Sequence, residues 1–265
     1  MNATEPSQQN IPDVSPLRRA VADLHLAAAF LTRLPLPDLG PVAEGGLARA
    51  MRGFPLVGGG LGILAGLVFM AAHSVLPAAL AAVLAVLALV LLTGALHEDG
   101  LADTADGLGA RGDRERRLEV MRDSRSGAYG VLALIFSIGI RAVALAQAPS
   151  GAAGLGALVA ACALGRALVP AAMQVMPPAR PDGLGAMAGV PDASVAALAA
   201  VLGLMLTVAG MGQAAPVVIV SAVAAALAVV AVARRALGGY TGDVLGAVVQ
   251  AAEAAVLVAA VGVWQ

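Results

Sequence analysis

Residues 54 to 72 read FPLVGGGLGILAGLVFMAA, a run without a single charged side chain. A helix needs about 20 consecutive apolar residues to cross the hydrocarbon core of a bilayer, so this run predicts a transmembrane helix. Glycines gather within it, in GGGLGILAG at 58 to 66. They predict close packing of this helix against a neighbour through the backbone, with a lining for a substrate path as the alternative.

The rest of the chain repeats this pattern. Further apolar runs fall at about 76 to 96, 129 to 149, 151 to 176, 193 to 213, 215 to 233 and 244 to 263. Apolar residues make up 60% of the chain and charged residues only 12%, against roughly a quarter charged residues in soluble domains. The sequence therefore predicts an all-α fold, a polytopic membrane helix bundle of about seven transmembrane helices.

The N-terminal region differs from these runs. Residues 1 to 16, MNATEPSQQNIPDVSP, are polar and predict a disordered tail. Ala20 to Leu31 is apolar but too short to span, and Asp23 and His25 interrupt it. We expect an interfacial or re-entrant helix here, followed by the spans, so that residues 17 to 265 form one integral-membrane domain.

The basic residues predict an orientation. All sixteen are Arg, five of them before residue 54 and six between 97 and 128, while the connections near 73 to 77, 149 to 151 and 213 to 216 carry no charge. The positive-inside rule then places the N-terminus and segment 97 to 128 in the cytoplasm and the protein in the cell inner membrane. We expect the lipid bilayer as a partner and no nucleic acid; the sequence leaves the oligomeric state open.

One segment concentrates the charge. From His97 to Gly130 the chain reads HEDGLADTADGLGARGDRERRLEVMRDSRSGAYG. Asp99, Asp103 and Asp106 are spaced i, i+4 and i+7, which places them on one face of a helix, where like charges repel. A divalent cation would remove the repulsion, and carboxylates without Cys favour Mg²⁺ or Mn²⁺ over Zn²⁺. We predict a metal site there, with Asp123 as a further ligand; a solvated acidic helix end is the alternative.

Arginines follow this acidic face directly. Planar guanidinium groups suit phosphate oxygens, so metal and Arg together describe a diphosphate site. Arg125 and Arg117 are the predicted substrate contacts, although cytoplasmic loops are also rich in Arg for orientation alone. His97 is a candidate general base. The six arginines are Arg111, Arg114, Arg116, Arg117, Arg122 and Arg125.

Three ionisable residues fall inside apolar runs: Arg141, Arg166 and Glu253. A charge within a membrane is costly and usually serves a site or a partner, so each is a candidate. Arg166 is a predicted substrate contact, and for Arg141 the alternative is a side chain that reaches the membrane interface. Gln250 lies on the same helical face as Glu253. Asp243, in YTGDVLG before the last run, is predicted to bring another carboxylate to the substrate.

Six motifs together resemble one family, the adenosylcobinamide-GDP ribazoletransferases, also called cobalamin synthases. They cover most of the chain in order: FLTRLPLP at 30 to 37, FPLVG at 54 to 58, HEDGLADTADG at 97 to 107, RRLEVMRDSRSGAYG at 116 to 130, ARPDGLG at 179 to 185 and GGYTGDVLGA at 238 to 247. The long Asp-rich motif is distinctive by itself.

The resemblance implies a reaction and a cofactor. A ribose hydroxyl of α-ribazole, or of its 5′-phosphate, attacks the cobinamide-bound phosphorus of adenosylcobinamide-GDP and expels GMP, with Mg²⁺ required. Asp99, Asp103, Asp106 and Asp123 then correspond to metal and diphosphate ligands, which Asp243 joins.

The proton acceptor implied is a carboxylate, Asp103 or Asp106, or His97. This chain differs from the family pattern at Gln250, where the family commonly has an acidic residue. This departure favours a structural role for that position and weakens a catalytic role for Glu253.

Two other functions compete. A CDP-alcohol phosphatidyltransferase would share the chemistry, but its signature has an Ala-Arg pair after the first Asp-Gly, where this chain has Ala102 and Asp103. A transporter would explain several spans and intramembrane charge, but the charge is concentrated in one loop and no inverted repeat is obvious. The sequence does not decide between α-ribazole and its 5′-phosphate as the acceptor.

Overall fold

The computed structural model describes residues 15 to 38 and 40 to 265. Throughout this part of the chain the regular structure is helical, with one isolated bridge between Pro178 and Tyr240. The tail predicted for residues 1 to 16 lies outside the described residues except for Ser15 and Pro16, which begin the first helix. The all-α prediction is confirmed.

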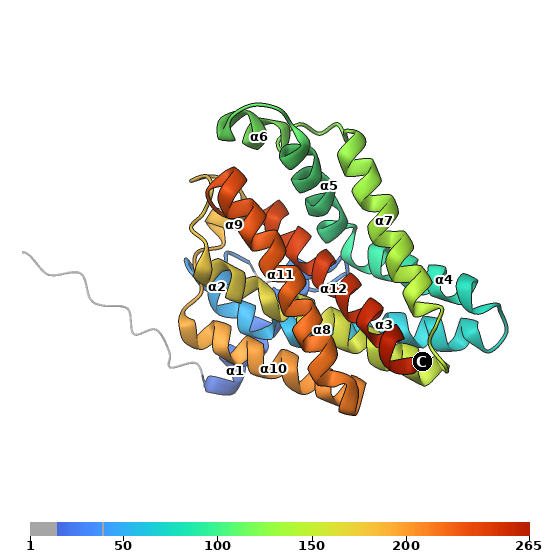
Figure 1. Ribbon diagram of the computed structural model, residues 1–265. Coiled ribbons are helices and arrows are strands. Elements are labelled where there is room, and N and C mark those ends of the chain that lie inside the picture. Colours follow the sequence, from blue (N-terminus) through green and yellow to red (C-terminus); the bar gives the residue numbers. More distant parts are fainter. Residues whose placement is uncertain (1–14, 39) are drawn as a thin grey trace, which may run out of the picture.

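The helices follow one another with short connections (Figure 1). They are α1 (Pro16–Leu31), α2 (Gly46–Ala50), α3 (Phe54–His73), α4 (Ala78–Thr93), α5 (Leu96–Gly109), α6 (Arg114–Val120), α7 (Ala128–Leu145), α8 (Gly151–Val175), α9 (Leu184–Met187), α10 (Ala193–Met211), α11 (Ala215–Leu237) and α12 (Gly242–Trp264), with 3₁₀ turns η1 (Met51–Gly53) and η2 (Gly212–Ala214).

Each of the seven predicted apolar ranges coincides with one helix: α3, α4, α7, α8, α10, α11 and α12. Among the described residues, five segments are long and apolar enough to cross a membrane, or six if α4 and α5 form one bent span. The count is below seven because α10 and α11 join in one apolar segment, Ala193–Leu237, and α4 is only 16 residues long. The chain is a multi-pass membrane protein.

Helix α8 is the most buried of these segments and packs against α3 and α10. Gly58, Gly62 and Gly66, one helical turn apart on α3, lie so close to α8 that an added Cβ atom would collide with its backbone. Gly156 of α8 and Gly210 of α10 meet in the same way. The close packing predicted from GGGLGILAG is therefore confirmed, since small residues let helix backbones approach.

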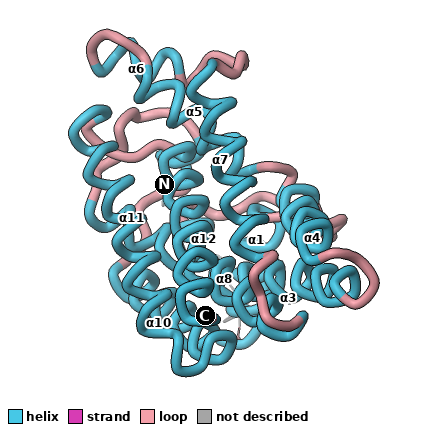
Figure 2. Tube along the Cα trace, turned by 45° about the vertical axis from the view of Figure 1, so that its right-hand side comes forward, coloured by secondary structure: helices cyan, strands magenta, loops and turns pink. Residues whose placement is uncertain are grey.

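The chain bends by 91° between α4 and α5. Gly94 and Ala95 adopt left-handed conformations there, with φ of 62° and 59°, which glycine accepts and alanine rarely does. The bend directs α5 away from the apolar α4, and α5 packs against α12 and α7. Figures 1 and 2 both show α5 and α6 at the end of the bundle opposite to the C-terminus.

Helix α1 begins at Pro16, where the Ser15 hydroxyl accepts a hydrogen bond from the Arg18 N–H. Asp23, which interrupts the apolar pattern, is buried and forms ion pairs with Arg49 of α2 and Arg52 of η1. A buried carboxylate needs such partners. This pairing fixes α1 to α2 and η1 and explains how a charged residue lies within the helix.

Candidate active site

A cavity of about 350 Å³ lies between α1, η1, α3, α5, α8, α12 and the loop before α10. Four ionisable side chains line it: His97 and Asp99 from α5, Asp243 from the first turn of α12, and Arg180 from the loop after α8. The first two come from the predicted acidic segment, and Asp243 comes from the YTGDVLG motif. The fold thus joins residues that are nearly 150 positions apart in sequence.

Asp103 lies one helical turn after Asp99 on α5 and is partly exposed. Its pKa is raised to about 6, first by burial and then by the negative charges of Asp99, Asp243 and Asp106, against which Arg180 acts. Carboxylates of α5 and α12 therefore approach each other with little positive charge nearby to offset their repulsion. In the described parts of the chain, no three His, Cys, Asp or Glu side chains already stand in the arrangement of a metal site.

Asp106 contacts the start of α7. Its two carboxylate oxygens accept hydrogen bonds from the N–H groups of Gly127, at 2.7 Å, and Gly130, at 2.9 Å. The first N–H groups of a helix have no partner within it. A carboxylate there accepts their hydrogen bonds and interacts favourably with the positive end of the helix dipole. Asp106 thus fastens α5 to α7, a structural role that the i, i+7 spacing alone did not indicate.

Asp123 and Arg125 lie in the connection between α6 and α7 and pair with each other. The Arg125 guanidinium donates to both oxygens of Asp123, at 2.7 to 3.3 Å, and these hydrogen bonds lower the pKa of Asp123 to about 2. Both side chains are outside the set that lines the cavity. Arg117 is half-buried on α6 and does not line the cavity either.

Arg180 is the cavity residue that sequence reasoning missed. Its side chain is 16% exposed, and its Nη2 lies 3.6 Å from Asp243 Oδ2. Nη1 is buried and has no hydrogen-bond partner among the described residues. A single Arg in a connection between spans looks like one of the charges that determine membrane orientation. Its place in the ARPDGLG motif was the one sequence signal that distinguished Arg180 from such charges.

The loop that carries Arg180 is fixed by contacts from two sides. Arg114 of α6 donates to the backbone carbonyls of Leu237, at 2.7 Å, and Ala179. The N–H of Ala179 donates to the carbonyl of Tyr240, at 2.7 Å. Arg122 also pairs with Asp182 at 2.7 Å. Two of the six arginines of segment 97 to 128, neither of them a predicted substrate contact, therefore hold the loop.

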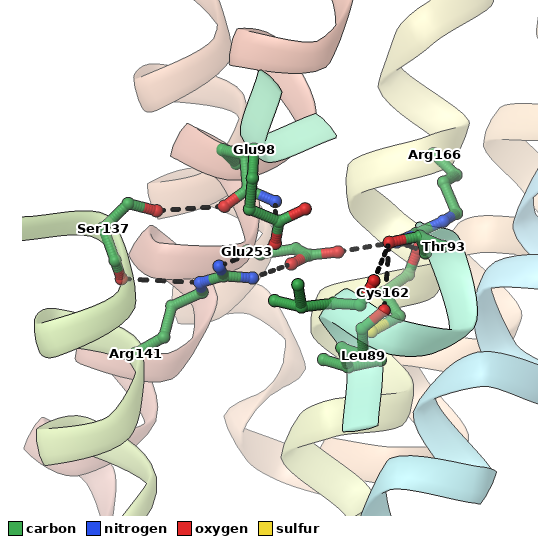
Figure 3. Close-up of polar contacts among 10 residues, drawn as sticks. Leu89, Thr93, Glu98, Ser137, Arg141, Cys162, Arg166 and Glu253 are labelled. Atoms are coloured by element: carbon green, nitrogen blue, oxygen red, sulfur yellow. Dashed lines mark hydrogen bonds and ion pairs between the residues drawn. The ribbon is translucent and has the colours of Figure 1, made fainter. Parts of the chain in front are cut away.

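A second charged cluster lies inside the bundle, and we call Glu98, Arg141, Arg166, Gln250 and Glu253 the buried network. Figure 3 shows Glu253 between the two arginines. Its oxygens accept from Arg141 Nη1 at 2.9 Å and from Arg166 Nη1 at 2.6 Å. Arg141 Nη2 and Gln250 Nε2 both donate to one Glu98 oxygen, at 2.9 and 3.1 Å. Each of these side chains is at most 6% exposed.

The buried network is electrically balanced, because two arginines face two glutamates. Burying an unpaired charge costs several kcal/mol, which such pairing offsets. The network ties α5, α7, α8 and α12 together. It places Arg166, predicted to contact substrate, among protein partners, and it gives Gln250 a structural role as a donor to Glu98 and an acceptor from Ser137.

Comparison with known proteins agrees with the motifs. The sequence model of the family described as cobalamin-5-phosphate synthase matches residues 23 to 261. No solved structure shows a significant match.

Three similar relatives are each named adenosylcobinamide-GDP ribazoletransferase. That of Bradyrhizobium diazoefficiens is 50% identical over 173 residues, 65% of this chain and 66% of the relative. That of Azorhizobium caulinodans is 46% identical over 172 residues, 62% and 64% of the two chains. That of Mesorhizobium japonicum is 45% identical over 166 residues, again 62% and 64%. The aligned part thus spans just under two thirds of each relative.

Proposed function

Because the chain belongs to the cobalamin-5-phosphate synthase family, we propose that it transfers the adenosylcobinamide phosphate group of adenosylcobinamide-GDP to α-ribazole or its 5′-phosphate. GMP is released and adenosylcobalamin, or its 5′-phosphate, is formed. The names of the relatives support this reaction over a CDP-alcohol phosphatidyltransferase or a transporter. The protein acts in the cell inner membrane, with its N-terminus and segment 97 to 128 in the cytoplasm, as the Arg distribution favours.

One observation carries the proposal: Asp99, Asp103 and Asp243 converge beside a cavity with Arg180 as their nearest opposite charge. Oxygen donors from two helices fit Mg²⁺, which binds through a few carboxylates together with substrate phosphates. Asp99, Asp103 and Asp243 would hold the ion, and when bound it would supply neutralisation of charge on the phosphate groups.

Asp106 and Asp123 remain predicted ligands. Each already accepts hydrogen bonds from its own neighbours, so metal binding there would share or replace those bonds.

The chain's own residues bind and orient the reactants. The unpartnered Nη1 of Arg180 suits a phosphate oxygen, because guanidinium groups bind phosphate through directed N–H donors. Arg125 and Arg117 remain predicted contacts for the donor, whereas Arg166, the third predicted contact, is paired with Glu253 inside the buried network. In the transfer, the ribose oxygen forms a bond to the cobinamide-bound phosphorus while the bond from that phosphorus to GMP breaks.

The hydroxyl proton of the acceptor passes to a carboxylate of the cluster or to His97, which is the weaker base because burial and the charge of Arg166 lower its pKa to about 3. Asp103 is a candidate by position, because it lies one turn from Asp99 on α5, but as a ligand of the ion it would have to keep one oxygen free to take the proton. His97 lines the cavity from the same helix. Asp106, whose two oxygens accept from Gly127 and Gly130, would need to release one of these bonds to act as a base.

GMP release tests the proposal. Purified protein in detergent, given adenosylcobinamide-GDP, α-ribazole and Mg²⁺, is expected to release GMP only when the acceptor and metal are present. Asp103→Asn should lower the rate by about 100-fold or more, the loss that follows removal of one group that stabilises the transition state.

Asp192→Asn is the matched control, since Asp192 is exposed at the start of α10 and makes no side-chain capping bond. Its rate should equal that of the unaltered protein. Folded protein that releases no GMP would refute the substrate assignment, and full activity of Asp103→Asn would refute the site.

A further inference from the structure

The cavity has two chemically different walls. Ionisable side chains from α5, α12 and the Arg180 loop form one wall. Apolar side chains from α1, η1 and α3 form the other, among them Phe30, Leu31, Met51 and Phe54. Since pockets of this kind bind through apolar contact and orient through a few polar groups, the two walls indicate a ligand with an apolar ring and a polar part.

The apolar wall contains an aromatic pair. The rings of Phe30 and Phe54 are stacked, with centroids 5.9 Å apart and an interplanar angle of 11°. Phe54 is 1% exposed, whereas Phe30 is partly exposed and lines the cavity. Phe30 therefore has ring surface available for a ligand, and every nucleic-acid base or related flat heterocycle has a face that stacks on phenylalanine.

The size of the cavity restricts the ligand further. Its volume of about 350 Å³ is near the lower limit of the range, roughly 300 to 1,000 Å³, that encloses drug-sized molecules. A nucleoside with a two-ring base fits this space. A corrin macrocycle that carries amide side chains and a nucleotide is much larger and does not.

We propose that this cavity is the binding site of the acceptor nucleoside, with its aromatic base against Phe30 and its ribose toward His97 and Asp99. The inference rests on the proposed transfer reaction and specifies which of the two substrates enters. The corrin part of the donor then remains outside the cavity, and only its phosphate groups reach the cavity residues Asp243 and Arg180 and the neighbouring Asp103. An acyl chain of a lipid would also suit the apolar wall, but it would leave His97 and Asp99, which the ribose would contact, without a polar partner from the ligand.

Steady-state kinetics can show which of the two substrates binds in the cavity. Phe30→Leu keeps an apolar side chain but removes the aromatic face, so the KM for α-ribazole should rise about tenfold, while the KM for adenosylcobinamide-GDP and kcat change less than about twofold. Phe136→Leu is the matched control, because Phe136 is exposed on α7 and outside this cavity. It should change neither KM.

Direct binding of benzimidazole, a two-ring base without ribose or phosphate, provides a readout that does not need turnover. Saturation-transfer NMR in detergent micelles should show binding to the unaltered protein and to Phe136→Leu, and a loss of at least fivefold in affinity for Phe30→Leu. Equal binding by Phe30→Leu and Phe136→Leu would show partition into micelles or lipid-like sites and would overturn the inference.

The outcomes keep the two proposals distinct. A rise in the KM for the donor alone would overturn the acceptor site and leave the transfer reaction intact. If benzimidazole binding depends on Phe30 but no GMP is released, the cavity assignment as an aromatic-base site holds and the transfer reaction fails.

Discussion

Helix α5 carries two kinds of carboxylate on neighbouring residues. Glu98 faces the bundle and lies in the buried network, where Arg141 and Gln250 donate to it. Asp99 faces the cavity beside Asp103. Helix α12 repeats the contrast, since Glu253 is paired with two arginines, whereas the partners of Asp243 among the described residues are the Thr241 hydroxyl and the more distant Arg180.

The contrast between the paired glutamates and the cavity aspartates distinguishes charges that stabilise the fold from charges that are available to bind a ligand. In the buried network every glutamate is paired with an arginine, so its charges balance without any further group, although Glu98 Oε2 and Arg166 Nε have no hydrogen-bond partner among the described residues. The cavity carboxylates outnumber their single arginine, and like charges that converge without a counter-charge destabilise the protein. Charge balance, more than burial, therefore separates the structural cluster from the candidate site.

The largest effect should come from unbalancing the buried network. Glu253→Gln leaves Arg141 and Arg166 with only Glu98, and breaking a buried ion pair costs about 3 kcal/mol or more. The thermal unfolding midpoint in detergent should fall by several degrees.

A balanced double variant sharpens this test. Replacing Arg166 and Glu253 together, as Arg166→Met and Glu253→Leu, leaves the neutral pair of Arg141 and Glu98. It should recover most of the stability lost in Glu253→Gln. If the double variant is no more stable than the single one, charge balance is not what holds this cluster.

Asp99→Asn should have the opposite effect in the absence of metal. Removing one carboxylate relieves repulsion on Asp103, so the metal-free protein should be as stable as the unaltered chain or slightly more stable. Mg²⁺ at about 100 times its dissociation constant should stabilise the unaltered protein by about 2.7 kcal/mol, and Asp99→Asn should lose most of this gain.

Melting with Mg²⁺ and with EDTA measures both effects, with Asp192→Asn as the control that keeps the full response. A gain from Mg²⁺ that is the same in Asp99→Asn and the unaltered protein would place the ion elsewhere, for example at the predicted ligand Asp123.

The sequence predicted the helices well because a bilayer requires apolar runs of a set length, and such runs are visible in order along the chain. It also predicted that Asp99 and Asp103 act on each other, since the i, i+4 spacing is local. The capping of α7 by Asp106 was not predictable, because it depends on where α7 is packed. The pairing of Arg141 with Glu253, 112 residues apart, and the place of Arg180 depend on tertiary structure in the same way.

The smallest effect concerns pH and again separates the two clusters. The pKa of Asp103 is raised from 3.8 to about 6, so between these values the folded protein binds more protons than the unfolded chain. By linkage, the stability that Asp103 contributes falls as pH rises through this window and returns as pH falls, by about 1 kcal/mol because solvent screens a partly exposed group. In EDTA, the unaltered protein should therefore melt higher at pH 5 than at pH 7. Asp103→Asn should lose this difference and Asp192→Asn should keep it. A pH difference that persists in Asp103→Asn would assign the titration to another group and remove the support that this pKa gives to an uncompensated cluster.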